Sequence, residues 1–286
     1  MKSIRFMASG LAHACPLGQR QAQCHMARMT LSTFQLSDRV VLSITGKDTH
    51  DFLQRVITTD MSGLAAGEIR SGALLTPQGK IVVDFLVHGR QDGVWIDVWR
   101  EAAESLLKRL TLYRLRADAQ IELGGDHAVI VGTGQPDPRS DALPRRAVLE
   151  PGNDPDAAAR QATLEIAAGV PAFGRDYGEA EVFPTDVNLD LFGGIGWKKG
   201  CFIGQEVLSR MKRRGTIRKR SVRITDSGEM LPAGADLVAG DLVIGQLTSV
   251  DGSCAIARIR TDRLEKADAA LTVDGTPVEV HLPGTD

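Results

Sequence analysis

The chain has 286 residues, of which 43% are hydrophobic, so it can bury the core of roughly one large domain or two to three small ones. Its 34 Lys and Arg nearly balance its 36 Asp and Glu, which excludes a globally cationic nucleic-acid binder but allows a local basic patch. No apolar run approaches the ~20 residues of a membrane-spanning helix, so no membrane association is expected.

The cysteines and the N-terminal residues indicate the cellular compartment. The four cysteines form no C-x-x-C pair and no regular framework, which favours a reducing environment. Residues 1–35 are basic, lack acidic residues and contain no continuous apolar segment, so they are predicted to be a disordered or targeting extension rather than a secretory signal. The chain is therefore expected in the bacterial cytoplasm, or in the mitochondrial matrix if this extension is a transit peptide.

From about Leu36 onward, strand patterns separated by short glycine-containing loops predict antiparallel pairing. These strands are predicted over residues 39–44, 70–75, 80–88, 93–99, 119–123 and 128–131. Apolar residues at helical spacing predict helices over 48–57 and 101–115. A further Ala-rich helix is predicted to open at Pro155 and to close at Gly169, and residues 132–144 read as a loop.

The C-terminal part changes to short strands and turns. Strands are predicted over 222–225, 235–238, 242–250, 255–260, 272–275 and 278–281. This spacing is typical of a small β-barrel or sandwich. Because successive strands are joined by tight turns throughout, the sequence predicts an antiparallel α+β fold rather than a doubly wound parallel sheet.

Several common ligand-binding motifs are missing from the sequence. It contains no full G-x-G-x-x-G between a strand and a helix, no Walker-type phosphate loop and no G-x-S-x-G elbow. The six histidines are scattered, so no metal site is predicted.

The most informative segment is Trp197–Glu206. Within it, Cys201 follows two lysines and Gly200, and a helix is predicted to begin just afterwards. Nearby cations and a helix N-terminus both favour a reactive thiolate, so an exposed Cys201 is the candidate catalytic residue. The alternative is a buried, inert cysteine beside two surface lysines.

Lys199-Gly-Cys-Phe-Ile-Gly-Gln-Glu206 resembles the K-G-C-[FY]-x-G-Q-E signature of the YgfZ family. Other segments are similar to those of this family in the same order: Thr45-Gly46, Phe52–Gln54, Thr76–Lys80, Tyr113–Arg116, Leu164–Pro171, Phe183–Leu189 and Gly245–Ser249. The resemblance runs from about Leu36 to about Arg260 and leaves only the N-terminal extension uncovered.

The resemblance implies a three-domain ring of the aminomethyltransferase type. Domain 1 would combine residues 36–46 and 118–215, domain 2 would be the insert 47–117, and domain 3 would be a β-barrel over 219–286. The resemblance also implies that the chain binds tetrahydrofolate or a one-carbon derivative. Its implied role is that of an accessory factor, not an enzyme with an assigned reaction, which supports iron–sulfur cluster assembly or repair and tRNA methylthiolation.

By resemblance, Asp84 is the candidate anchor for the folate, since aminomethyltransferases place an aspartate of this segment near the reacting folate nitrogen. It alternates with apolar Val82 and Leu86, which favours a cleft over a solvent-facing position. Tyr113 and Arg116 are further candidates, although packing and helix C-terminal charge explain them equally well. The remaining candidates for cofactor binding are Lys199, Gly200, Gln205, Glu206 and Arg210.

A dense basic run follows the Cys201 motif and contains no acidic residue. Its members are Arg210, Lys212, Arg213, Arg214, Arg218, Lys219, Arg220 and Arg223. Such a run is usually a solvated face, but here it would attract the folate glutamates or an acidic partner protein. RNA contact is less favoured because no aromatic residues are interleaved. The expected partners are thus folate and iron–sulfur client or assembly proteins, with the chain itself a monomer.

Two other functions compete with this interpretation. The first is a genuine aminomethyltransferase of glycine cleavage, but those enzymes lack the K-G-C signature and have longer C-terminal domains. The second is a non-catalytic interaction module that has lost folate binding.

Overall fold

The computed structural model describes residues 33–215, 217–226, 228 and 230–284. The predicted extension over residues 1–35 therefore lies outside the described residues except for positions 33–35. Among the described helices, none is both long enough and apolar enough to cross a membrane.

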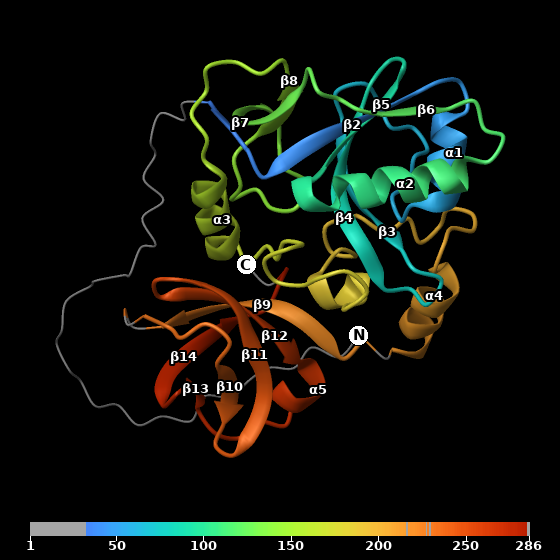
Figure 1. Cartoon of the computed structure of the whole chain (residues 1–286). Coiled ribbons are helices and arrows are strands. Elements are labelled where there is room, and N and C mark those ends of the chain that lie inside the picture. Colours follow the sequence, from blue (N-terminus) through green and yellow to red (C-terminus); the bar gives the residue numbers. More distant parts are fainter. Residues whose placement is uncertain (1–32, 216, 227, 229, 285–286) are drawn as a thin grey trace.

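A five-stranded antiparallel sheet forms the centre of the N-terminal part (Figure 1). Runs of Val, Ile and Leu build its longest strands, because such side chains pack well on a pleated, buried surface. In spatial order its strands are β3 Ile69–Leu75, β4 Ile81–Gly89, β5 Gly93–Trp99, β2 Arg39–Thr45 and β6 Gln120–Leu123.

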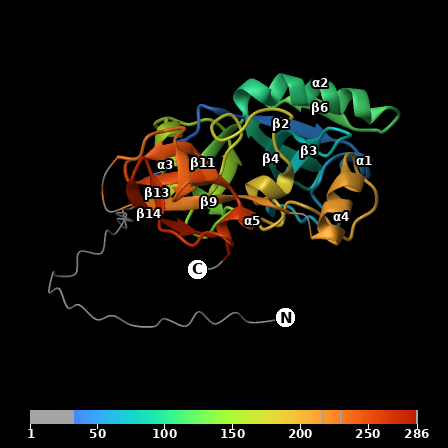
Figure 2. The same ribbon diagram turned by 90° about the horizontal axis from the view of Figure 1, so that it is seen from below.

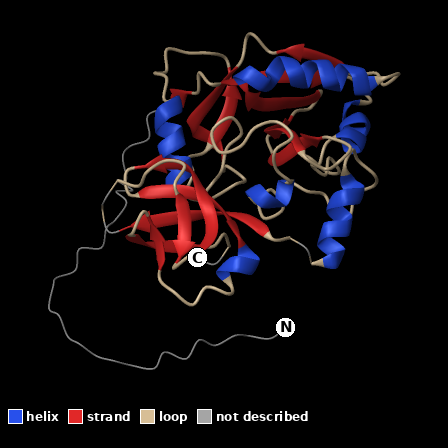
Figure 3. Ribbon diagram, turned by 60° about the horizontal axis from the view of Figure 1, so that its bottom comes forward, coloured by secondary structure: helices blue, strands red, loops and turns tan. Residues whose placement is uncertain are grey.

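The two faces of this sheet differ in chemistry. Along β4, Phe85 faces one side and Asp84 the other, and the pairing of β4 with β5 puts Asp97 on the side of Asp84. The Phe85 face packs against a layer of helices (Figure 3). Leu106 and Leu110 of this layer are fully buried. This layer consists of α1 Thr49–Val56, the short η1 Arg100–Ala102 and α2 Ala103–Arg114.

A smaller sheet covers part of the opposite face. Its strands, in the order β1-β7-β8, are β1 Phe34–Gln35, β7 Ala128–Gln135 and β8 Arg146–Leu149. Val129 and Val131 of β7 pack with Val41 of the large sheet in a shared apolar cluster. Three further helices follow along the chain: α3 Ala158–Ala167, η2 Pro184–Val187 and α4 Gln205–Arg214.

The C-terminal part is a closed six-stranded barrel with its own apolar core. The order around the barrel is β10-β11-β12-β9-β14-β13. Its elements are β9 Lys219–Asp226, β10 Asp236–Ala239, β11 Leu242–Asp251, β12 Cys254–Arg260, α5 Thr261–Leu264, β13 Leu271–Val273 and β14 Thr276–His281. Closure removes free strand edges, which an open sheet of this size would expose.

The barrel is joined to the rest of the chain through the segment that contains η2, which lies between the two parts in both views (Figures 1 and 2). Arg220 of β9 forms a bidentate ion pair with Asp190. Asn188 is fully buried and donates from Nδ2 to the carbonyl oxygen of Ser221 at 2.8 Å. Buried polar contacts of this kind fix the position of the barrel beside η2.

The structure confirms the antiparallel α+β class and the C-terminal barrel. The prediction of a loop over 132–144 is wrong at its start, because β7 continues to Gln135 with Gly132 and Gly134 at positive φ. The domain boundaries stay a prediction. However, β2 and β6, which were assigned to domain 1, are hydrogen-bonded into the same sheet as the strands of the expected insert.

Candidate functional site

The loop over residues 196–204, here called the Cys201 loop, presents an exposed free cysteine. Lys199, two residues before it, is only 9% exposed. Its ammonium donates to the carbonyl oxygens of Ile57 at 2.7 Å and Thr59 at 2.5 Å. Burial lowers the pKa of Lys199 to about 8. The lysine therefore attaches the loop to the segment after α1.

A second attachment lies on the other side of Cys201. Gly204 adopts φ +77°, and a Cβ at this position would lie 2.6 Å from the carbonyl oxygen of Thr76 and 3.0 Å from Cα of Gly79. Only glycine allows both the conformation and the close approach. The Thr76–Lys80 turn and the Lys199–Glu206 motif, which are far apart in the sequence, therefore meet here. The backbone is held on both sides of the exposed sulfur.

Asp84 lies half-buried at the floor of a crevice on the far face of the large sheet. Tyr177 donates from its hydroxyl to Oδ2 of Asp84 at 2.6 Å. Burial raises the pKa of the Asp84 carboxyl, while the guanidiniums of Arg39 and Arg139 act in the opposite direction. Asp84 thus faces a cleft, as its alternation with apolar residues predicts.

This crevice has polar groups that suit a pterin but little free space. The hydroxyl oxygen of Ser71, also in its lining, is buried without a hydrogen-bond partner among the described residues. The free volume is only about 20 Å³, which is room for about one water molecule. A pterin ring therefore enters only if the surrounding side chains move.

A buried ion-pair network surrounds Asp84, and no local sequence pattern predicts it. Its members are Arg39, Asp97, Arg146, Asp137, Arg139, Glu165, Arg175 and Asp176. Arg146 is 1% exposed and contacts Asp97 at 2.6 Å. Burial alone would raise the pKa of Asp97, but the adjacent guanidiniums of Arg39 and Arg146 hold it well below its usual range.

The network extends to the barrel through Asp176. Its Oδ1 accepts hydrogen bonds from the hydroxyls of Thr248 and Ser249, both at 2.6 Å. Its Oδ2 accepts from the backbone N–H of Ala172 and pairs with Arg175. The Gly245–Ser249 segment, singled out only by resemblance, therefore has a structural role in attaching the barrel.

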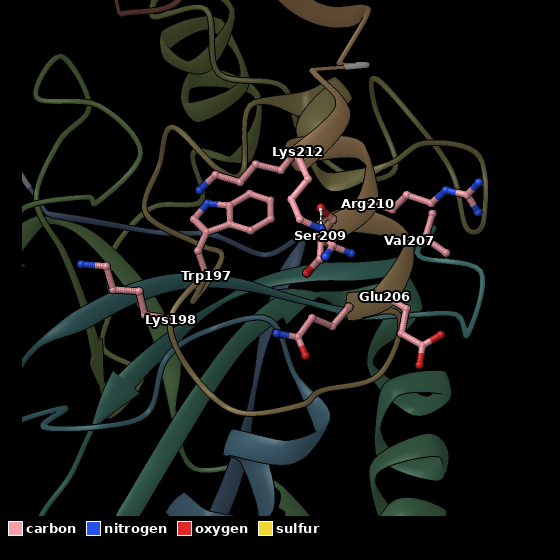
Figure 4. A pocket seen from close by; sticks show the side chains of 9 residues that line it. Trp197, Lys198, Glu206, Val207, Ser209, Arg210 and Lys212 are labelled. Atoms are coloured by element: carbon pink, nitrogen blue, oxygen red, sulfur yellow. Dashed lines mark hydrogen bonds between the residues drawn. The ribbon is translucent and has the colours of Figure 1, made fainter.

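An open cavity of about 900 Å³ lies along α4 and is called the α4 cavity here (Figure 4). Its lining consists of Trp197, Lys198, Gln205, Glu206, Val207, Ser209, Arg210, Lys212 and Arg213. Three predicted cofactor-binding residues, Gln205, Glu206 and Arg210, are thus brought together. Neither Asp84 nor Cys201 is part of this lining, so the predicted site is divided among three places.

Two predicted residues lie elsewhere. Tyr113 belongs to α2 and packs against the helix-covered face of the sheet, whereas Asp84 is on the other face. Arg116 is exposed just after α2. Neither lines the crevice, so the structure does not bring them to Asp84.

The basic run is only partly a solvated face. Arg210, Lys212, Arg213 and Arg214 of α4 are exposed. Arg220, in contrast, is paired with Asp190, and Arg223 donates to the carbonyl oxygen of Ala167. Arg218 and Lys219 are exposed as well, so four of the six exposed cations of this run lie on α4.

Two known protein-family models match parts of this chain. The model of the GCVT N-terminal domain matches residues 18–123, and that of the CAF17 C-terminal beta-barrel domain matches residues 218–285. The chain is 26% identical over 290 residues to the tRNA-modifying protein YgfZ of Edwardsiella ictaluri, with 86% of each protein covered. The resemblance to the YgfZ family is confirmed.

Other relatives carry the name of iron–sulfur cluster assembly factor IBA57. The chain is 25% identical to the human mitochondrial protein over 282 residues, which covers 81% of this chain and 78% of that protein. It is 27% identical to the homolog from Mycosarcoma maydis and spans 63% of that protein's length. The aminomethyltransferase T of the glycine cleavage system from Bartonella henselae shares the fold, with a TM-score of 0.72 at 16% identity, covering 88% of this chain and 85% of that one. The predicted aminomethyltransferase/YgfZ type of fold is therefore also confirmed.

Proposed function

We propose that this chain supports iron–sulfur cluster assembly or repair in client enzymes, including those that methylthiolate tRNA. The names of the IBA57 and YgfZ relatives support this role. The observation that carries the proposal is the exposed sulfur of Cys201 on a loop attached at both sides, by Lys199 and by Gly204. A preorganised, accessible thiol is what an exchange reaction or the transient capture of a group on a client protein needs.

In this proposal Cys201 is the reacting group and Lys199 is a positioning residue. The ammonium of Lys199 is directed at two backbone carbonyl oxygens, so it acts by holding the loop. Gly200 is exposed beside the sulfur and leaves room for a partner to approach. The chain is proposed to act as a monomer on client or assembly proteins, in the bacterial cytoplasm or the mitochondrial matrix.

We further propose that tetrahydrofolate or a one-carbon derivative binds at the Asp84 crevice. Asp84, Ser71 and Tyr177 offer acceptors and donors for the pterin edge, and Arg39 and Arg139 add positive charge. Binding has to open the crevice. Titration of the full chain with tetrahydrofolate should give saturable binding that weakens about tenfold or more in Asp84→Asn. Equal affinity of both proteins would contradict the assignment of Asp84. Folate binding stays a prediction for the other candidate residues: Tyr113, Arg116, Lys199, Gly200, Gln205, Glu206 and Arg210.

Rescue of a strain that lacks its own YgfZ-type protein tests the cellular role. The chain should restore iron–sulfur enzyme activity and tRNA methylthiolation. Failure of a well-expressed chain to restore either would overturn the proposal. An assay of one-carbon transfer from an aminomethyl-lipoyl carrier covers the competing function, and robust turnover there would make the chain an aminomethyltransferase instead.

A further inference from the structure

The α4 cavity combines a large volume with strong positive charge. Lys198, Arg210, Lys212 and Arg213 contribute four cations to its lining, and Glu206 contributes the one carboxylate. Among the described residues, no carboxylate lies within ion-pair distance of any of the four. Positive charges gathered on one face without carboxylate partners raise the local concentration of anionic ligands.

The shape of this surface follows from the helix. Residues 205, 209 and 212 form one ridge of α4, and residues 206, 210 and 213 form the next, because side chains three and four apart lie above one another. Leu208 is the only buried residue of the helix. Gln205 and Ser209 are half-buried, whereas Glu206, Arg210, Lys212 and Arg213 are exposed, so the two ridges are largely accessible. Each ridge spans eight residues, with a rise of about 10 Å, which matches two turns of a docked helix.

The lining favours a protein segment over RNA. Trp197 is the single aromatic side chain of the cavity, and the Lys212 ammonium lies 4.0 Å from the centre of its ring (Figure 4). One face of this ring is therefore covered, which leaves little aromatic surface for the base stacking that single-stranded RNA binding uses. Gln205 and Ser209 in the lining can hydrogen-bond a peptide backbone.

From these observations we infer that the α4 cavity docks an acidic segment of a partner protein and brings it next to Cys201. The second half of the inference rests on connectivity: Lys198 and Gln205, which both line the cavity, are the two flanks of the stretch that carries Cys201. This deepens the proposed function, on which it rests, by naming the kind of partner. An iron–sulfur client or assembly protein would be recognised through carboxylates, not through RNA.

The test uses the full chain and a short fluorescein-labelled peptide rich in Glu and Leu. Binding is measured by anisotropy at about 150 mM salt and again at lower salt. The double variant Arg210→Glu/Arg213→Glu should bind the peptide about tenfold or more weakly than the wild type. A matched control, Lys108→Glu/Lys266→Glu, reverses two exposed charges outside the cavity and should bind like the wild type. Unchanged melting of both variants shows that they are folded.

Two competitors decide between the possible occupants. An oligouridylate of equal net charge and a polyglutamyl folate are titrated against the same proteins. Tighter binding of either competitor than of the peptide, or equal peptide affinity of the double variant and the wild type, would overturn the inference. Monoglutamyl tetrahydrofolate is titrated in parallel, and its failure to bind would contradict the folate proposal alone. Peptide binding that is no tighter than competitor binding would contradict only the docking of an acidic segment.

Discussion

Replacement of Asp97 by Asn probes the buried network beside the Asp84 crevice. The Asp97 carboxylate is fully buried and accepts from Arg39 and Arg146, each at 2.6 Å. Asn keeps the shape but removes the negative charge, and it can accept through one oxygen only. Two guanidiniums, 11% and 1% exposed, then lose their shared counter-ion.

Removing one partner of a buried ion pair costs about 3–5 kcal/mol, because the remaining charge stays desolvated. Arg146 keeps a second carboxylate, Asp137, at 3.3 Å, so the lower end of this range applies. We expect the free energy of unfolding to fall by about 3 kcal/mol, which corresponds to a decrease in Tm of about 6–12 °C for this size of unit.

Tryptophan fluorescence during urea unfolding measures this change. All three tryptophans, Trp95, Trp99 and Trp197, precede the barrel, so the signal reports on the part that contains the network. Asp92→Asn is the control, because Asp92 pairs with Arg90 at 2.8 Å but its side chain is 58% exposed. This control should cost less than about 1 kcal/mol. An equally small change in the free energy of unfolding in Asp97→Asn would refute the argument that burial makes the loss of an ion pair strongly destabilising.

Three further predictions concern charge and backbone conformation. The paired guanidiniums overcome the effect of burial and lower the pKa of Asp137 to about 2. Its contribution to stability, about 2 kcal/mol, is therefore present above about pH 4 and is lost as the pH falls towards 2. Asp137→Asn should make the free energy of unfolding less dependent on pH in this range. Burial lowers the pKa of Lys199 from 10.5 to about 8. Between these pH values the unfolded chain binds more protons than the folded chain, so stability should rise from pH 8 to 10.5. The melting temperature of Lys199→Met should lack this rise. Gly204→Ala should lower the free energy of unfolding by about 2–3 kcal/mol, because φ is positive and the added Cβ would lie 2.6 Å from the carbonyl oxygen of Thr76. Gly215 also has a positive φ but faces open space, so Gly215→Ala should cost about 1 kcal/mol. Denaturant unfolding measures both values.

Local patterns predicted the regular elements well. Alternating and β-branched runs gave the strands of the large sheet and the barrel to within a few residues, and Gly169 marks the end of α3 with positive φ as expected. The three-stranded sheet was not predicted as a unit. Its strands β1 and β8 have two and four residues, and they pair across distances in sequence that no local pattern encodes.

The site was predicted in part. The alternation along β4 correctly placed Asp84 in a cleft, and the motif placed Gln205, Glu206 and Arg210 near one another. The inward orientation of the Lys199 side chain was not predictable, because two adjacent lysines, Lys198 and Lys199, resemble a solvent-exposed pair. Arg146 was missed for a similar reason: an arginine next to Arg145 resembles a solvent-exposed basic pair, and only the fold brings Asp97 and Asp137 to it.

The most direct measurement of the central claim is the activity of iron–sulfur enzymes in the rescued strain when Cys201 is replaced by Ser. Cys201→Ser keeps a side chain of similar size and replaces the thiol by a hydroxyl, and Cys254→Ala serves as the control for a thiol buried in the barrel. With equal protein levels, we expect Cys201→Ser to lose most of the iron–sulfur enzyme activity and tRNA methylthiolation, and Cys254→Ala to retain both. Full activity of Cys201→Ser would show that the exposed sulfur takes no part in the function.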